Sequence, residues 1–160
     1  MKLTIATADG EFIARYSEKG LAELNFPLVR RASPRAAKKG NSPASIRGWH
    51  RLTAAALKAI LAGREPKEIP PLDLAGTPFQ KSVWQALRKI SFGKTKSYGE
   101  IAQAIGRPKA VRAVGGACGA NPIPVLVPCH RVLAANQKLG GFSGGLEWTR
   151  HLLAREGWAG

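Results

Sequence analysis

Hydrophobic and polar residues alternate over the first 26 positions of the chain. Leu3 and Ile5, followed by Phe12, Ala14 and Tyr16, occupy every second position of two such runs. This spacing places side chains on one face of a β-strand. Turn-forming residues separate the runs at positions 8–10 and 17–20. The pattern predicts a three-stranded antiparallel meander with one buried face.

Helical spacing replaces the alternation after residues 27–41, a polar and basic stretch that we expect to form an exposed loop. Ser42 is the expected N-cap residue, with Pro43 at the first helical position, and Gly63 ends the predicted helix. The apolar positions at helical spacing are Ile46, Trp49, Leu52, Ala56, Leu57 and Ile60. This helix would cover the buried face of the small sheet.

Residues 63–76 contain three prolines and predict an extended connector, which is the expected domain boundary. We assign residues 1–75 to an N-terminal domain of sheet and helix. Residues 76–160 form the second predicted domain.

Capping signals predict three helices after the connector. The run from Thr77 to Gln80 and the run from Ser97 to Glu100 each have the residues of a capping box. The first of these helices has apolar positions at Phe79, Val83, Leu87 and Ile90 and is expected to end at Gly93. The second ends at Gly106, and after a turn at Arg107 and Pro108 the third spans residues 109–119. A helix, a short turn and a helix are typical of a helix-turn-helix.

Residues 121–127 are too apolar for an exposed loop, and we expect a short buried strand that leads to Cys129. A glycine-rich stretch at residues 140–145 precedes a last helix at residues 146–155. The predicted fold class is α+β: a small N-terminal antiparallel sheet plus a helix, joined to a mostly helical C-terminal domain with a helix-turn-helix.

Charge changes this picture, because the chain has 25 Lys and Arg residues against 10 Asp and Glu, a formal charge of +15. Between Asp73 and Glu147 the only carboxylate is Glu100. A basic cluster can be simply a solvated face, but its coincidence with a helix-turn-helix favours DNA as the partner. No apolar run has the roughly 18 residues of a membrane span, so we expect a cytoplasmic protein.

Cys129 and His130 are the sharpest chemical feature of the sequence. A buried cysteine is often an inert hydrophobic residue, but a thiolate beside a base or cation is a nucleophile, and His130 or Arg131 can supply that neighbour. The imidazole then needs an acid to orient it. Glu100 is used in a helix cap, and Glu147 lies near the start of the last helix. We therefore expect Glu156 to be the acid that orients the imidazole.

The motif Pro-Cys-His-Arg-Val at residues 128–132 is preceded by Asn-Pro-Ile-Pro at 121–124 and followed by Gly-Phe-Ser-Gly-Gly-Leu at 141–146. With Ser-Tyr-Gly-Glu at 97–100 and Arg-Ala-Val-Gly at 112–115, it resembles the signature of the O6-alkylguanine-DNA alkyltransferases. The resemblance covers residues 77–157 and reaches the N-terminal half only in outline.

The resemblance implies a DNA repair protein that flips O6-alkylated guanine out of duplex DNA and transfers the alkyl group irreversibly to Cys129. Whether O4-alkylthymine is also a substrate stays open. By position, His130 would take the proton of the thiol through a water, and Glu156 would orient His130. Asn121 would support the active-site turn. Tyr98 would donate a hydrogen bond or proton to the leaving guanine.

The resemblance also implies how DNA is bound. Arg112 would enter the base stack while the third helix lies in the minor groove, where the small residues Ala113 and Gly115 allow close approach. The backbone of Val132 and Ser143 would bind the edges of the flipped base. Arg112 as a phosphate contact and Tyr98 as a core aromatic residue are the structural alternatives.

Double-stranded DNA is therefore the expected partner, the protein is expected to be a monomer, and no cofactor is implied. We predict no metal, because no cysteine precedes Cys118 and His50 is the only histidine of the first half. Phe142 stands where many members of the family have tyrosine. Two other functions stay open: a lesion binder related to the family, although such relatives lack the acceptor cysteine, and a helix-turn-helix regulator that reads a defined site as a dimer.

Overall fold

The computed structural model of the chain describes residues 1–27, 43–134 and 146–157. Its first part is an antiparallel sheet of three strands, β1 (Lys2–Thr7), β2 (Gly10–Tyr16) and β3 (Leu21–Asn25), in the order β1-β2-β3. Leu3 lies opposite Ala14 and Ile5 opposite Phe12. These residues share the face that the alternation predicted, so the meander is confirmed.

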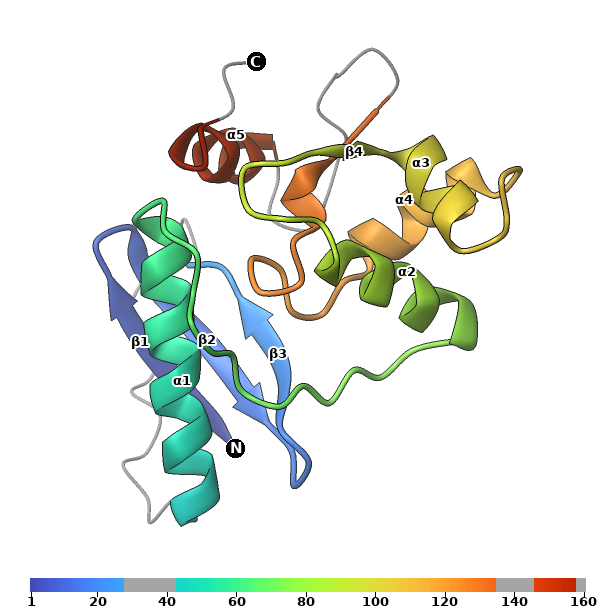
Figure 1. Cartoon of the computed structure of the whole chain (residues 1–160). Coiled ribbons are helices and arrows are strands. Elements are labelled where there is room, and N and C mark those ends of the chain that lie inside the picture. Colours follow the sequence, from blue (N-terminus) through green and yellow to red (C-terminus); the bar gives the residue numbers. More distant parts are fainter. Residues whose placement is uncertain (28–42, 135–145, 158–160) are drawn as a thin grey trace.

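Helix α1 (Ala44–Leu61) lies across one face of this sheet (Figure 1). Its buried side chains are Ile46, Thr53, Ala56, Leu57, Ile60 and Leu61. The predicted start differs by one residue, because Pro43 itself is the N-cap residue and makes no side-chain cap; Ser42 and the basic loop lie outside the described residues. The helix ends at Leu61, shortly before Gly63, whose φ of +76° a helix does not allow.

The connector at residues 63–76 is packed against the sheet. The N–H of Leu21 donates to the carbonyl of Pro71 (2.8 Å), and the N–H of Asp73 donates to the carbonyl of Leu21 (2.7 Å). At Gly20 a Cβ atom would lie 2.2 Å from the oxygen of Pro71, so the close approach requires glycine. The connector therefore runs along the edge of β3.

Both predicted capping boxes are confirmed. Thr77 and Gln80 cap α2 (Pro78–Arg88), and Ser97 and Glu100 cap α3 (Tyr98–Ala104), with side chain and backbone bonded reciprocally in each. Helix α2 ends at Arg88, five residues before the expected Gly93, which leaves the carbonyl of Ile90 free to accept a bond from Arg131 (3.0 Å).

Helix α4 (Val111–Gly119) packs against both α2 and α3 and completes the predicted helix-turn-helix. The indole N–H of Trp84 on α2 donates to the carbonyl of Ala117 on α4 (2.8 Å). The buried side of α4 consists of Val114, Ala117 and Cys118. The opposite side of the helix faces solvent.

The segment before Cys129 is buried as expected, but it turns instead of forming a strand. The N–H of Val127 bonds back to the carbonyl of Ile123 (2.9 Å), and Val125 has a φ of +76°. A short helix η1 (Cys129–Arg131) comes next, and strand β5 (Val132–Leu133) lies after the cysteine, pairing in parallel with β4 (Lys96–Ser97). The short strand expected at residues 121–127 is therefore not formed, and β5 is a separate strand that follows the cysteine.

The last helix, α5 (Leu146–Arg155), has the predicted bounds and lies between η1 and the end of α1 (Figure 1). One hydrophobic core contains residues from both halves of the chain, from Ile5 and Phe12 to Val132 and Leu152. The two predicted domains are therefore packed into each other, and their boundary at residues 75 and 76 stays a prediction. Among the described helices, none has the length and apolar character needed to cross a bilayer.

Candidate active site

The turn that carries Cys129 is held by a buried asparagine. The side-chain amide of Asn121 donates to the carbonyl of Val127 (2.8 Å), and its oxygen accepts from the N–H of Ile123 (2.9 Å). The N–H of Cys129 then bonds to the same Val127 carbonyl (2.8 Å). The side chain of Asn121 thus takes the place of strand partners for this segment, through its bonds to Val127 and Ile123.

Cys129 is a buried thiol with only 3% of its surface exposed. Burial raises the pKa of Cys129 to about 12, although the Asn121 side chain and backbone N–H groups partly oppose this effect. A cysteine with this pKa is protonated at neutral pH. The resting side chain is therefore a thiol, and it becomes a nucleophile only when a base takes its proton.

The neighbouring imidazole is placed and oriented by Glu156. His130 is fully buried, and its Nε2 lies 2.8 Å from Oε2 of Glu156. A carboxylate only accepts hydrogen bonds, so Nε2 carries the proton and Nδ1 holds a free lone pair. Within the described residues Nδ1 has no hydrogen-bond partner. A buried imidazole nitrogen with an unused lone pair is a base ready to accept a proton.

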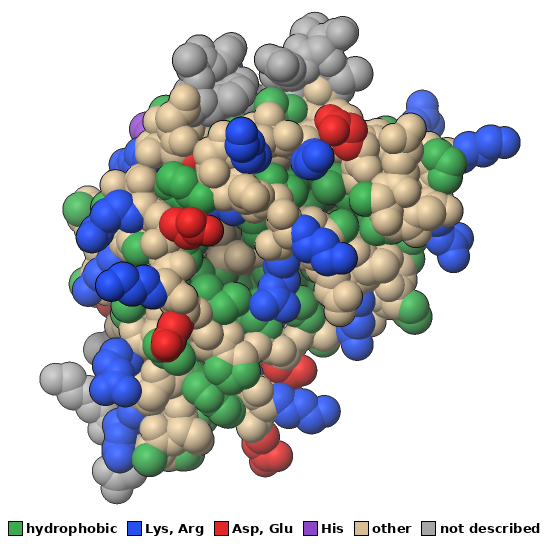
Figure 2. Space-filling view, in the orientation of Figure 1, with side chains coloured by type: hydrophobic (Ala, Val, Ile, Leu, Met, Phe, Trp, Pro, Cys, Tyr) green, Lys and Arg blue, Asp and Glu red, His purple; other side chains and the backbone are tan. Residues whose placement is uncertain are grey.

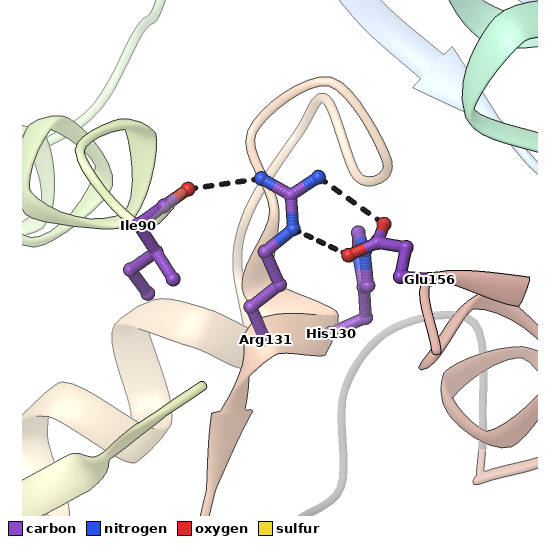
Figure 3. A network of polar contacts seen from close by, with 4 residues as sticks. All are labelled: Ile90, His130, Arg131 and Glu156. Atoms are coloured by element: carbon purple, nitrogen blue, oxygen red, sulfur yellow. Dashed lines mark hydrogen bonds and ion pairs between the residues drawn. The ribbon is translucent and has the colours of Figure 1, made fainter. Parts of the chain in front are cut away.

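Arg131 forms the other side of this cluster (Figure 3). Its Nε donates to Oε1 of Glu156 (2.7 Å) and its Nη2 to Oε2 (3.1 Å), while Nη1 reaches the carbonyl of Ile90. The guanidinium also lies 5.5 Å from the centre of the Phe92 ring. The sequence offered Arg131 as a cation for the thiol; the structure places it on the carboxylate instead.

The contacts within this cluster set the protonation of Glu156 and His130. Burial alone would raise the pKa of Glu156, but hydrogen bonds from His130 and Arg131 lower it to about 2. Burial lowers the pKa of His130, and Glu156 only partly opposes that shift. The resting cluster is therefore a neutral imidazole, a carboxylate and a guanidinium.

Tyr98 is half-buried at the first position of α3, directly after the cap residue Ser97. Burial raises the pKa of Tyr98 to about 12, with smaller contributions from Cys118 and Cys129. The phenol therefore keeps its proton at neutral pH and can act as a hydrogen-bond donor.

The exposed face of α4 is basic at its start and nearly bare beyond it. Arg112, Ala113 and Gly116 are exposed, whereas Gly115 is half-buried at the edge of this face. Figure 2 shows Lys and Arg side chains spread over the molecule, including the end formed by the helix-turn-helix. A narrow face without bulky side chains suits close approach to a nucleic-acid backbone.

Of the remaining predicted site residues, the structure describes Val132 but not Ser143. Val132 is buried and begins β5, next to the cluster. Ser143 and Phe142 lie outside the described residues. The role of Arg131 is the feature that sequence reasoning missed; its only signal was a second basic residue beside His130.

Comparison with known proteins identifies the family of the second half of the chain. The model of the family described as "6-O-methylguanine DNA methyltransferase, DNA binding domain" matches residues 78–158. A methylated-DNA--protein-cysteine methyltransferase of Haemophilus influenzae is 56% identical over 86 residues, which are 54% of this chain and 48% of that protein. A protein of the same name from Mycolicibacterium paratuberculosis is 53% identical over 100 residues, 62% of this chain and 61% of that protein.

Among solved structures, this chain resembles that of Mycobacterium tuberculosis OGT in complex with DNA, with a TM-score of 0.76 and 37% sequence identity. The superposition covers 97% of this chain and 91% of the other chain. The fold similarity therefore includes the N-terminal half. The sequence matches are shorter. The chain spans 48% of the Haemophilus influenzae protein and 61% of the Mycolicibacterium paratuberculosis protein.

Proposed function

The chain belongs to the 6-O-methylguanine DNA methyltransferase family, and from this premise we propose that it repairs duplex DNA by moving an alkyl group from O6 of guanine to the sulfur of Cys129. The observation that carries the proposal is the arrangement beside this sulfur. The next residue, His130, has a free Nδ1 lone pair and is held through Nε2 by an ionised Glu156.

The proposed reaction begins with the proton of the thiol. It passes to Nδ1 of His130, through one water, as the sulfur attacks the alkyl carbon. The carbon–sulfur bond forms while the carbon–oxygen bond to O6 breaks, and the departing guanine receives a hydrogen bond or proton from Tyr98. Glu156 stabilises the transient imidazolium of His130. The imidazolium then releases its proton through water, to the tyrosinate if Tyr98 gave up its own proton and otherwise to the guanine anion, so overall one proton moves from the thiol to the guanine.

The product limits each molecule to a single turnover. Cys129 ends as a thioether, and a thioether contains no good leaving group through which the free thiol is restored. The protein is therefore an alkyltransferase that is consumed stoichiometrically.

Access to the sulfur requires base flipping in this proposal. A stacked guanine cannot reach a buried thiol, and extrusion costs roughly a few kcal/mol. Arg112 at the exposed start of α4 fills the gap in the stack, and the small residues of that face, including Ala113 and Gly115, let the helix enter the minor groove. The backbone of Val132 and Ser143 binds the flipped base.

The test is transfer from a duplex that contains one O6-methylguanine. We expect the peptide with Cys129 to gain one methyl group per protein molecule while unmodified guanine reappears in the DNA. Cys129→Ala abolishes this transfer. The matched control is Cys118→Ala, which removes the other buried thiol and leaves transfer intact. Restored guanine alongside an unmodified Cys129 peptide excludes the proposal.

The same assay separates the alternatives. A lesion binder would retain the methylated base in the DNA, and a regulator would bind one duplex sequence far more tightly than others. We expect equal affinity for unrelated duplexes and a monomer in solution. A parallel duplex with O4-methylthymine determines whether that lesion is also a substrate.

A further inference from the structure

An ion pair joins the two halves of the chain. The guanidinium of Arg155, the last residue of α5, bonds both oxygens of Asp9 in the turn between β1 and β2, each at 2.8 Å. Its Nη1 also donates to the carbonyl of Leu61 at the end of α1 (3.1 Å). One side chain thus connects three elements, and two parallel bonds to one carboxylate fix its direction.

The backbone of Arg155 is fitted just as closely. A Cβ atom at Gly63 would lie 2.4 Å from the carbonyl oxygen of Arg155, so the chain after α1 passes directly over the end of α5. The start of α5 is held as well, because the ring of Trp148 lies 5.6 Å from that of Phe12 and 4.8 Å from that of Phe26. Helix α5 is therefore fixed to the N-terminal half at both ends.

This attachment matters because Arg155 directly precedes Glu156, whose carboxylate accepts hydrogen bonds from His130 and Arg131. Bonds of 2.7 and 2.8 Å tolerate little displacement. An ordinary ion pair of this exposure, 31% for Arg155 and 25% for Asp9, contributes little to stability, but a shift of the helix end would move the carboxylate directly.

We propose that Asp9 and Arg155 are positioning residues for alkyl transfer, through which the N-terminal half holds Glu156 against His130. This inference rests on the proposed function. The ion pair also lines a surface hollow of about 550 Å³ together with Lys58, so water can replace a lost partner and the variants are expected to fold.

The test compares Asp9→Asn, Arg155→Gln and the double variant with the wild type. At saturating DNA, each single variant should lower the first-order transfer rate by about 10-fold, because small misplacements of a catalytic group are costly. The Kd for DNA should not change. The double variant should lose no more than Arg155→Gln alone, because that change already removes the ion pair with Asp9 together with the bond to Leu61. Glu23→Gln is the matched control, since it breaks the Arg15–Glu23 pair (3.1 Å) of the same sheet, which includes no residue of α5.

A second readout does not depend on activity. The proton on Nε2 of His130, donated to Glu156, should give a slowly exchanging NMR signal in the wild type and in Glu23→Gln. It should broaden or exchange rapidly in Asp9→Asn. A rate and a His130 signal that both match the control overturn the inference, as do losses that multiply in the double variant. If the wild type transfers no alkyl group, the proposed function fails, and the His130 signal still decides the positioning role.

Discussion

At the scale of single residues, the site is built around one carboxylate. Glu156 is almost fully buried, with 1% of its side chain exposed, and it is bonded on one side by an imidazole and on the other by a guanidinium. Arg131 keeps the carboxylate ionised, and the ionised carboxylate keeps the imidazole proton on Nε2. Arg131 thus acts on His130 through Glu156, because it helps to keep the lone pair of His130 on Nδ1.

Glu156→Gln tests this dependence. The change leaves the charge of Arg131 buried without its partner, so the free energy of unfolding should fall by about 3 kcal/mol, measured by urea denaturation. The transfer rate should fall as well, because nothing then stabilises an imidazolium. Asp73→Asn, on the connector, is a control of equal charge change. A variant with wild-type rate and stability would contradict the arrangement.

The buried thiol makes a prediction for the pH dependence of transfer. Because the pKa of Cys129 is raised to about 12, the rate should show no inflection near the ~8.5 of a free cysteine. It should decline on the acidic side, below 6.5, because burial lowers the pKa of His130 and the imidazole becomes protonated only there. Single-turnover rates between pH 5 and 9 check both limbs. A rate that rises with thiol ionisation around pH 8.5 rules out His130 as the base.

At the scale of elements, helix ends and turns were predictable where one short motif decides them. Thr77 with Gln80 and Ser97 with Glu100 satisfy their own backbone groups, so four residues suffice to predict each helix start. The segment at 121–128 was not predictable in the same way. It is as apolar as a strand, but its course depends on the bonds of Asn121 and on the left-handed backbone conformation of Val125. β-Branched residues rarely adopt this conformation.

The glycines of α4 give a prediction at this scale. At Gly116 a Cβ atom would meet nothing within 4 Å, so the fold does not require glycine there. Gly116→Ala should raise the free energy of unfolding by about 1 kcal/mol through helix propensity. Gly116→Leu should fold but weaken DNA binding, because its side chain obstructs a narrow groove.

The control for Gly116 is on another helix. Gly48 of α1 also has nothing within 4 Å of an added Cβ atom. Gly48→Leu should therefore leave the Kd for DNA unchanged. Equal Kd values for the two leucine variants would show that α4 does not approach DNA closely. Both Kd values are obtained by fluorescence titration with one labelled duplex.

At the scale of the whole molecule, the halves share a core and are joined through α5. The acid partner of His130 was predictable from the sequence, since Glu156 was the remaining carboxylate of the second half. The role of Arg131 and the pair of Asp9 with Arg155 were not, because residues 146 positions apart meet only in the folded chain. The raised pKa of Cys129 also arises from burial, which a sequence motif does not report.

The same burial predicts how stability depends on pH. His130 and His50 both have a lowered pKa because they are buried. Below pH 6.5 the unfolded chain therefore binds more protons than the folded chain. The free energy of unfolding then decreases as the pH decreases, by up to about 1.4 kcal/mol per pH unit for each proton. The pKa of Glu156, lowered to about 2, adds a further loss below its ordinary 4.5 as the pH falls toward 2.

Urea denaturation at pH 7.5, 6 and 5 measures this slope. His130→Asn should flatten it by the share of one proton, and His50→Gln should do so independently. A stability that is constant from pH 7.5 to 5 would show that neither imidazole is held neutral by the fold.

In the proposed single-turnover reaction, the sulfur of Cys129 must not be lost to other reagents. Because Cys129 lies inside the fold and keeps its proton, peroxides and alkylating drugs dissolved around the protein meet an unreactive side chain. In the proposed function, a molecule shaped like the damaged guanine would reach the sulfur together with His130, which takes the thiol proton. Inactivators of this protein should therefore be purines with a labile O6 substituent, and general thiol reagents should be poor ones.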